Sequence, residues 1–466
     1  MAIDYQPTAF GDSFPILRST AVSHTLPAFL VSTTRGFLPR TEPISFLPAN
    51  FDALESLLQH MPIKTLDGGP GLLATGSLGE EVKKLPDLTE AIEEAKDDLP
   101  LMNALYRDYS FLASAYLLEP CHMSFLRGEG YGLGRDRLPA NIAKPIARVA
   151  ELAGFKPFME YAGSYALYNY RMADASKGLE YSNLRLIRAF EHGLDPTSSE
   201  AGFVLVHVDM VQNSGPMIAG TEQALEAVSA NDRAVFEEGM RTVLAALTKV
   251  NAVMERMWTK SKPGEYIQFR TFIFGITSQS MFPNGVIYEG VSDKPLSFRG
   301  ESGANDSMIP LVDNLLSIPM PSTPLTEILH DFRSYRPGNH RAFLEWVKYR
   351  SESVDLRSFA MQTPSAASLY LQILNQVRDF RWRHWCFTRE YILKKTSHPV
   401  ATGGSPIVTW LPNQLQAVLD LMVDVAGRFE GEELPGCEGI REMVAGWQEK
   451  LRREVEKYCE ERGVST

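Results

Sequence analysis

Hydrophobic residues recur along most of this chain at intervals of three and four, the spacing that places them on one face of an α-helix. There is no convincing β-hairpin series, internal repeat or low-complexity tract. The pattern predicts a predominantly α-helical, all-α fold. The predicted helices cover residues 51–61, 88–99, 101–119, 141–153, 160–172, 221–258 (a pair), 308–318, 369–393 and two stretches that start near 413 and 440.

One apolar run leaves its secondary structure open. Residues 202–211, GFVLVHVDMV, are almost continuously hydrophobic. A buried strand and a fully buried helix give the same pattern over so short a length. In either structure we expect its histidine, His207, inside the protein, where the simplest role is that of a core histidine.

The helix predicted over residues 369–393 carries a histidine on its apolar face. An isolated charge there is costly, so the imidazole is neutral and hydrogen-bonded, paired with an acid, or bound to a metal. Neighbouring arginines favour an anionic group across the helix, and a haem combines both demands. A hydrogen-bonded core histidine is the simpler alternative. The shared face holds Leu369, Ile373, Val377, Phe380, His384, Phe387 and Tyr391, and the arginines are Arg378, Arg381 and Arg383.

The length of 466 residues exceeds what one hydrophobic core usually serves, so we expect two domains. Residues 192–201 combine Gly, Pro, Asp and two Ser, which is typical of a linker. We therefore predict a small N-terminal domain over 1–191 and a large helical domain over 202–466.

Composition narrows the class of protein. A formal net charge of -11 argues against nucleic acid or an anionic membrane surface as partner. The four cysteines form no CxxC pair, no apolar run reaches the roughly 20 residues of a membrane span, and the N-terminus lacks a secretory signal pattern. We expect a soluble cytoplasmic protein.

Two further features suggest and exclude ligands. Arg270 is the one charge among the apolar residues of 266–276, and it needs an anionic partner from the protein or from a ligand. The glycines of 127–139 alternate as G-x-G-x-G-x-G and fail the dinucleotide fingerprint, so we interpret that segment as an ordinary turn-rich loop.

Several motifs, taken together, resemble the indoleamine 2,3-dioxygenase family over residues 138–406. They are LPANIAKPIARVAELAGFKPFMEYA, VIYEG, FRGESGANDSMIPLVDNLLSI, FRSYRPGNHRAFL, RWRHWCFTREYIL and ATGGSP. The resemblance implies a two-domain helical fold with haem b between the domains. It also implies O2 as co-substrate, ferrous iron, and therefore an electron donor.

The resemblance assigns roles to individual residues. His384 matches the proximal haem ligand, with its second ring nitrogen held by an acceptor. Ser302 matches a serine near the haem propionates, with Gly303 beside it, and Arg381 and Asp313 match an ion pair at the haem edge. These five residues are the expected metal and cofactor site.

Further matches concern the substrate. Arg270 matches the arginine that pairs with the substrate carboxylate, and Thr402 with Gly403 matches a loop that closes over the amino-acid end. Tyr161 matches the tyrosine near the indole, although Ala162 fits in another register. Tyr266 lies near an aromatic pocket position, with simple core packing as the alternative.

The distal, catalytic position above the haem falls on His207 if the alignment is anchored at residues 202–203. It falls on Leu205 if the anchor is Asp209. We favour His207, which would then steady bound oxygen or contact the indole N–H.

The resemblance implies conversion of L-tryptophan to N-formylkynurenine, the first step of the kynurenine pathway. A modified tryptophan or indole alkaloid as substrate, or a haem sensor without catalysis, are the alternatives. Departures from the family keep the substrate open, since Glu301 replaces a glycine, Phe274 a serine and Val211 an acidic residue. Glu301 would either line the entrance and favour an amine-bearing substrate, or face solvent.

Overall fold

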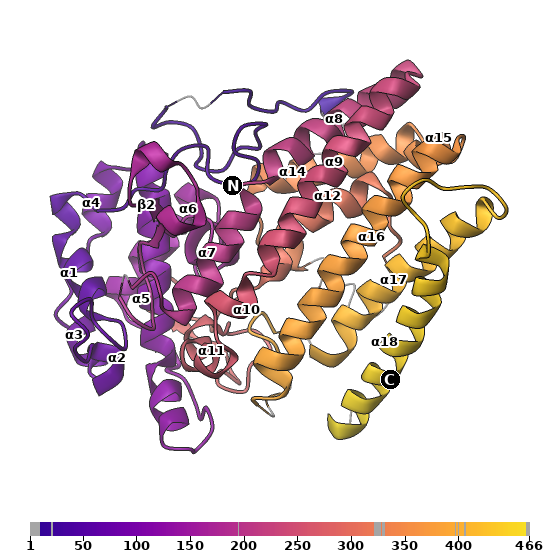
Figure 1. Ribbon diagram of the computed structural model, residues 1–466. Helices are drawn as coiled ribbons and strands as arrows, with labels where there is room; N and C mark the ends of the chain where they lie inside the picture. Colours follow the sequence, from indigo (N-terminus) through magenta and orange to yellow (C-terminus); the bar gives the residue numbers. More distant parts are fainter. Residues whose placement is uncertain are drawn as a thin grey trace.

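The computed structural model describes residues 10–19, 22–193, 195–320, 328, 331–396, 398, 400–404 and 407–462. Helices make up most of the chain, and its strands are only two or three residues long. The predicted predominantly α-helical fold is confirmed. Figure 1 shows the first third of the chain on one side of the molecule and the last two helices on the opposite side.

The first third surrounds one long helix, α5 (Leu99–Leu126), which starts where the Asp98 side chain accepts the Leu101 N–H. Helix α6 (Ala140–Ala153) packs along α5, and residues on nearly every face of α5 are buried. A helix that is hydrophobic on all sides belongs in an interior. Four short helices lie before it, α1 (Asp52–His60), α2 (Leu72–Thr75), α3 (Leu78–Val82) and α4 (Thr89–Glu94).

The helix predicted over residues 160–172 is wrong. A single π-helical turn, Tyr161–Tyr165, gives way to strand β2 (Tyr170–Met172), which pairs antiparallel with β3 (Leu184–Leu186). The Glu160 carboxylate accepts the N–H groups of Ala162 and Gly163 and so caps the N-terminal end of this turn. The tyrosines that follow favour extended structure.

The ambiguous run 202–211 is helical and forms most of α7 (Ser199–Val211), whose N-cap is Ser198. Its buried residues surround the helix, which explains why periodicity could not identify it. Phe203 and His207, one turn apart, are only partly buried and share one face. That face borders a cavity described below.

The predicted helix pair over 221–258 is present as α8 (Ser214–Ala230) and α9 (Arg233–Met254), which pack on each other. The histidine-bearing helix is α16 (Pro364–Phe387), which continues into a π-helical turn, Thr388–Leu393. α16 packs against α9 on one side and α17 (Ile407–Arg428) on the other, and α18 (Ile440–Arg462) follows outside α17.

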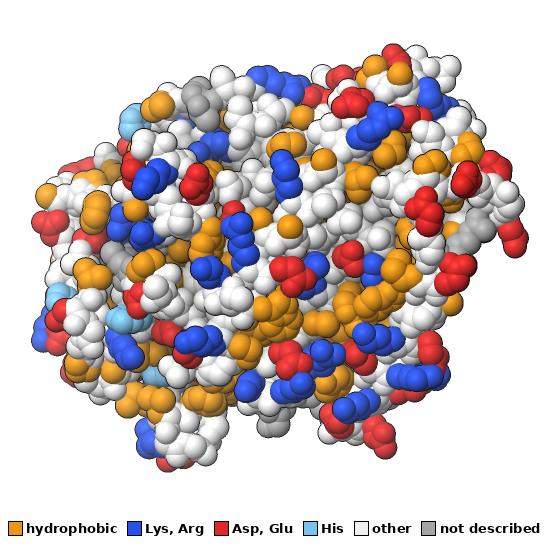
Figure 2. Space-filling model, viewed as in Figure 1, with side chains coloured by type: hydrophobic (Ala, Val, Ile, Leu, Met, Phe, Trp, Pro, Cys, Tyr) orange, Lys and Arg blue, Asp and Glu red, His pale blue; other side chains and the backbone are white. Residues whose placement is uncertain are grey.

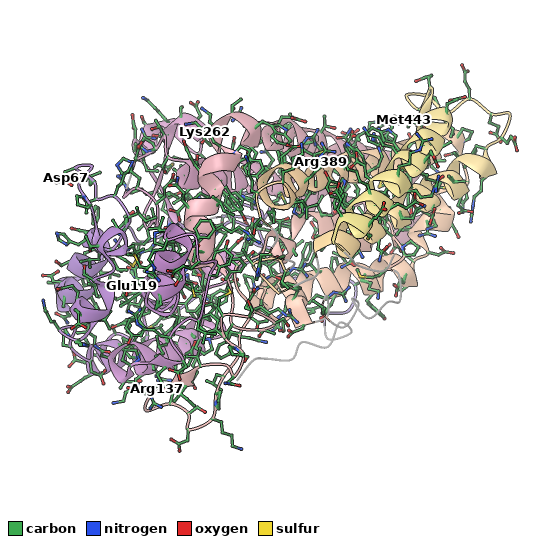
Figure 3. The ribbon with its side chains drawn as sticks, turned by 90° about the horizontal axis from the view of Figure 1, so that it is seen from below. Asp67, Glu119, Arg137, Lys262, Arg389 and Met443 are labelled. Atoms are coloured by element: carbon green, nitrogen blue, oxygen red, sulfur yellow. The ribbon has the colours of Figure 1, made fainter. Side chains whose placement is uncertain are left out.

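The remaining elements connect these layers. They are α10 (Met257–Lys260), α11 (Pro263–Arg270), α12 (Met308–Leu315), α14 (Gly338–Ser353), α15 (Leu356–Ala360), and the parallel pair β1 (Arg137–Leu138) and β4 (Ile287–Tyr288). Seen from below, Lys262 at the start of α11 lies between Glu119 of α5 and Arg389 after α16 (Figure 3). Helix α7 contacts strand β3 on one side and helix α9, which packs on α16, on the other.

The predicted linker, 192–201, is partly helical. Residues 199–201 form the first turn of α7, and Glu200 is buried, with its carboxylate accepting the Phe190 and Glu191 N–H groups. Residue 194 lies outside the described residues. One hydrophobic cluster includes side chains from before and after this segment, so the proposed boundary stays a prediction.

None of the described helices combines the length and apolar character needed to cross a bilayer. Figure 2 shows acidic and basic side chains interspersed over this face, with hydrophobic side chains gathered in a band between α10 and α18.

Candidate functional site

Two cavities meet at His384 on α16. They contain about 960 and 1140 Å³ of empty space, including the parts open to solvent. His384, Gly303 and Ala304 line both of them.

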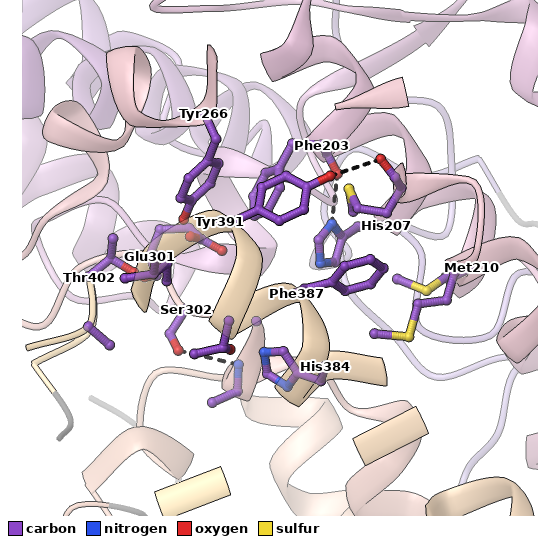
Figure 4. Close-up of a pocket in the computed structure, with 17 residues that line it drawn as sticks. Phe203, His207, Met210, Tyr266, Glu301, Ser302, His384, Phe387, Tyr391 and Thr402 are labelled. Atoms are coloured by element: carbon purple, nitrogen blue, oxygen red, sulfur yellow. Dashed lines mark hydrogen bonds between the residues drawn. The ribbon is translucent and has the colours of Figure 1, made fainter. Parts of the chain in front are cut away.

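The first cavity has mostly apolar walls, which come from several parts of the chain. Phe203, His207 and Met210 come from α7, Met254 and Met257 from the region of α9 and α10, Tyr266 from α11, and Phe387, Thr388, Tyr391 and Ile392 from the end of α16 and its π-helical turn. Figure 4 shows the two histidines facing this pocket, with Glu301 and Thr402 on one side and Met210 on the other.

The His384 imidazole has no hydrogen bond to any described residue, so the expected acceptor for its second nitrogen is not found among them. Burial, with the nearby His207, lowers the pKa of His384 to about 4. The ring is therefore neutral at pH 7 and offers a lone pair between two cavities. The buried His122 also lacks hydrogen-bond partners but lines neither cavity, so it is the position of His384 between the two cavities that suits coordination to a metal.

The π-helical turn after α16 shapes the wall next to His384. Wider helical turns of this kind are frequent at functional sites. Within this turn, the Tyr391 hydroxyl donates to the carbonyls of Met257 (3.1 Å) and Ser261 (2.5 Å). The end of α16 is thereby fastened to the segment between α10 and α11.

His207 lines the first cavity, whereas Leu205 is buried elsewhere and does not line it. Its Nδ1 lies 2.8 Å from the Phe203 carbonyl oxygen. Because a carbonyl only accepts, Nδ1 carries the proton, and burial lowers the pKa of the ring so that it is neutral. Its Nε2 is consequently an acceptor.

Arg270 is fully buried at the end of α11, just outside the lining of the first cavity. Its Nη2 donates to the Val400 carbonyl at 3.2 Å, and its guanidinium lies 4.6 Å from the centre of the Phe274 ring. Its Nε and Nη1 have no hydrogen-bond partner among the described residues. Buried donors without a partner are uncommon in folded proteins, and a bound ligand or water molecule would satisfy these two.

Tyr266 and Tyr161 occupy different places. Tyr266 lines the first cavity, with its ring 5.3 Å from that of Phe203. Tyr161 stands behind His207, with ring centres 5.8 Å apart, and its hydroxyl donates to Asp306 at 3.4 Å. Neither Tyr161 nor Ala162 lines the cavity.

Ser302 and Gly303 enter the cavity on a loop that a close crossing of two segments holds in place. A Cβ on Gly300 would lie 2.2 Å from the Gly275 nitrogen, so both positions require glycine. Ser302 then caps a short 3-10 turn by accepting the Ala304 N–H at 3.3 Å. Gly303 leaves open the space toward His207 Nε2.

Thr402 lines the cavity, and its hydroxyl donates to the Glu301 carbonyl at 2.8 Å. Gly403 does not line it but packs against Ser302 and Phe332, where a Cβ would clash with the phenylalanine ring. Residues 405 and 406 of the predicted loop lie outside the described residues.

The second cavity holds the predicted ion pair, in which Arg381 Nη2 lies 2.7 Å from Asp313 Oδ2. The other Asp313 oxygen is buried without a partner among the described residues, and burial raises the pKa of Asp313. Arg336, another lining residue, donates to the carbonyls of Asn305 and Ala304. Further basic residues on this wall are Arg333, Arg341 and Lys348.

These features fit a haem. The unpartnered, neutral imidazole of His384 would bind its iron, and the basic wall of the second cavity would suit the carboxylates of its edge. All the described residues that line the two cavities belong to the predicted large domain, and Phe203 is the first of them in the sequence. Tyr161, of the predicted small domain, packs behind His207.

Glu301 does not face solvent, so that alternative is wrong. Only 2% of the residue is exposed, and it lines the first cavity. The Gly275–Gly300 crossing turns this loop inward, and no local sequence signal reveals such a crossing. Burial, with the charge of Glu160, raises the pKa of Glu301 to about 8.

Sequence reasoning missed several wall residues. Phe387 and Tyr391 share the apolar helix face of His384, and Phe203 lies one helical turn before His207. Helical periodicity could therefore have placed all three beside these histidines. Met254, Met257 and Arg336 carried no such signal, because only the packing of distant helices brings them to the cavities.

The comparisons agree with the sequence motifs. A family model described as indoleamine 2,3-dioxygenase matches residues 25–411. Indoleamine 2,3-dioxygenase 1 of Rattus norvegicus is 27% identical over 362 residues, which cover 73% of this chain and 84% of the rat protein. The enzyme of Saccharomyces cerevisiae is 25% identical over 406 residues (82% and 83%), and nanC of Aspergillus nanangensis is 26% identical over 401 (82% and 90%).

Proposed function

The chain belongs to the indoleamine 2,3-dioxygenase family, whose members are haem-dependent dioxygenases of indole substrates, and we propose that it converts L-tryptophan to N-formylkynurenine. The observation that carries the proposal is the hydrogen-bond-free imidazole of His384 between two cavities, one of which has the buried Arg270, with free donors, just outside its lining. The chemistry that a bound haem supplies is activation of O2 for insertion across the indole C2–C3 bond.

His384 would hold the cofactor through its free lone pair. Arg381, whose Nη2 lies 2.7 Å from Asp313 Oδ2, would place a positive charge in the second cavity. Because the ion pair already holds this side chain, cofactor binding would not have to order it. Gly303, which lines both cavities, would form the edge between them, with Ser302 beside it in the first cavity. An electron donor is required to keep iron ferrous.

Arg270 would bind the substrate carboxylate through Nε and Nη1, the two donors that no described residue uses. Phe203 and Tyr266 would pack against the indole, and Thr402 with Gly403 would cover the amino-acid end. These apolar walls exclude water from the reacting ring.

His207 would act on the indole nitrogen. Its Nδ1 is committed to the Phe203 carbonyl, so its Nε2 can accept a hydrogen bond but not donate one. That favours contact with the indole N–H over stabilisation of bound oxygen.

The test is aerobic turnover by the reduced, haem-supplemented protein with L-tryptophan, followed by mass analysis of the product. A gain of two oxygen atoms, both labelled when 18O2 is used, is the expected result. A haem spectrum with no oxygen consumption on any indole would contradict the proposal and indicate a haem-binding protein without catalysis.

A further inference from the structure

Glu301 is a buried carboxylate that the protein does not satisfy. It is 2% exposed, and its carboxylate oxygens have no hydrogen bond or ion pair with any described residue. Glu160, which is equally buried, differs because its carboxylate accepts the Ala162 and Gly163 N–H groups. Glu301 therefore lacks the compensation that Glu160 has.

The cavity offers this carboxylate no counter-charge. Among the described lining residues, Glu301 is the only Asp or Glu, and there is no Lys or Arg. The acidic and phenolic groups that face it are Glu160, Tyr161, Tyr165 and Tyr266, none of which is a cation. A buried carboxylate in such surroundings either holds a proton or receives a cation from a ligand.

The backbone fixes Glu301 in this position. The Thr402 hydroxyl donates to its carbonyl, and the preceding Gly300 crosses Gly275 at closer range than any side chain would permit. Figure 4 shows Glu301 on the same side of the pocket as Tyr266 and Thr402. The carboxylate is thus held in the cavity wall.

A complementary charge, that of Arg270, lies near Tyr266 and just outside the cavity lining. Burial raises the pKa of Tyr266, and among the smaller contributions Arg270 lowers it while Glu301 raises it, so the phenol is within reach of both charges. Arg270 has two free donors and Glu301 has free acceptors. An unpaired carboxylate therefore lines the cavity, and a buried cation with free donors lies just outside that lining.

We propose that Glu301 binds a protonated amine of the indole substrate and so selects indoles that carry an ammonium group over indole acids and neutral indoles. This deepens the proposed function and rests on it for the indole part of the ligand. With Arg270 on the carboxylate, the pair would recognise both charged groups of a zwitterionic amino acid.

The test measures binding without turnover, by calorimetry on the haem-loaded protein in oxygen-free solution at pH 7. Three probes separate the groups: tryptamine has the ammonium only, indole-3-propionate the carboxylate only, and L-tryptophan both. Glu301→Gln is expected to weaken tryptamine and L-tryptophan by about tenfold or more and to leave indole-3-propionate unchanged or tighter. Glu301→Asp should restore part of the loss.

Wild-type protein gives a second readout that needs no variant. Because the pKa of free Glu301 is raised to about 8, the carboxyl is mostly protonated at pH 7 and must release its proton when a cation binds. Heats measured in phosphate and in Tris should therefore differ for tryptamine but not for indole-3-propionate. Glu301→Gln should abolish the difference.

Glu200→Gln is the matched control, since Glu200 is also buried with its pKa raised to about 8 but does not line the cavity. It should bind all three probes like wild type. Equal loss for the three probes in Glu301→Gln, or no proton release with tryptamine, would overturn the inference. Because no step requires oxygen, its failure is separate from failure to form N-formylkynurenine.

Discussion

In or beside the first cavity, His384, Arg270 and Glu301 keep polar atoms without partners among the described residues. Most buried polar groups in folded proteins are hydrogen-bonded, and each exception calls for an explanation. All three lie in or beside the same cavity. A haem would supply a metal for His384, and a zwitterionic indole substrate would supply a carboxylate for Arg270 and an amine for Glu301.

His384→Ala should abolish retention of haem, because it removes the free imidazole between the two cavities. Protein supplemented with haem and then desalted should carry at least about tenfold less haem than wild type, measured by Soret absorbance and total haem content. Added imidazole should restore part of the pigment. His24→Ala, at an exposed position, is the control, and full pigment in His384→Ala would exclude the assigned ligand.

Glu301→Gln should stabilise the ligand-free protein at alkaline pH. The pKa of Glu301 is raised to about 8, so the folded state holds a proton that the unfolded state has lost, and stability falls as pH rises toward 8. Removing the carboxyl should gain on the order of 3 kcal/mol at pH 8.5 and little at pH 4. Denaturant unfolding at both pH values measures this, and an equal change at both would contradict it.

At the scale of elements, the site depends on the segments that connect the helices. After α11, residues 271–275 cross the 298–300 segment, and Gly275 meets Gly300 with no room for a Cβ. The Ile276 and Thr277 N–H groups donate to the Phe298 carbonyl beside this crossing. The crossing carries Arg270 on one segment and Glu301 on the other.

Gly300→Ala should therefore damage both stability and the site. The added Cβ would lie 2.2 Å from the Gly275 nitrogen, and backbone must move to accept it. We expect a loss of about 2–4 kcal/mol in unfolding free energy and weaker L-tryptophan binding. Gly338→Ala is the control, because nothing lies within 4 Å of its Cβ at the start of α14. Equal stability of the two variants would refute the close crossing.

At the scale of the whole molecule, buried histidines and buried glutamates change the stability of the fold in opposite directions as the pH rises. Burial lowers the pKa of four histidines to about 3 or 4, so the folded state is favoured above pH 6.5 and loses this advantage as pH falls. Burial raises the pKa of three glutamates to about 8, which weakens the fold as pH rises. The groups are His122, His340, His384, His398, Glu160, Glu200 and Glu301.

The haem-free protein should consequently have a stability maximum near about pH 6.5, since only the glutamate effect remains above the ordinary histidine pKa. Thermal unfolding midpoints measured from pH 4 to 9 should decline on both sides of that value. A midpoint that rises steadily to pH 9 would contradict the raised carboxyl pKa values.

The sequence by itself determined the helical class, the helices around 101–119, 221–258 and 369–393, and the family, because periodicity and motif spacing are local properties of the chain. It also indicated His384 as an unusual residue on an apolar face. Local patterns failed at 160–172, where a side chain closes the turn onto its own backbone, and at 202–211, where burial on all sides removes periodicity.

Only the tertiary structure decided which polar groups go unsatisfied. Arg270 and Glu301 are 31 residues apart, and their free donors and acceptors are evident only once the surrounding segments are packed. The same packing brought His207 rather than Leu205 to the cavity and turned Glu301 away from solvent. Burial and hydrogen bonding depend on contacts between distant segments, and a one-dimensional pattern does not contain them.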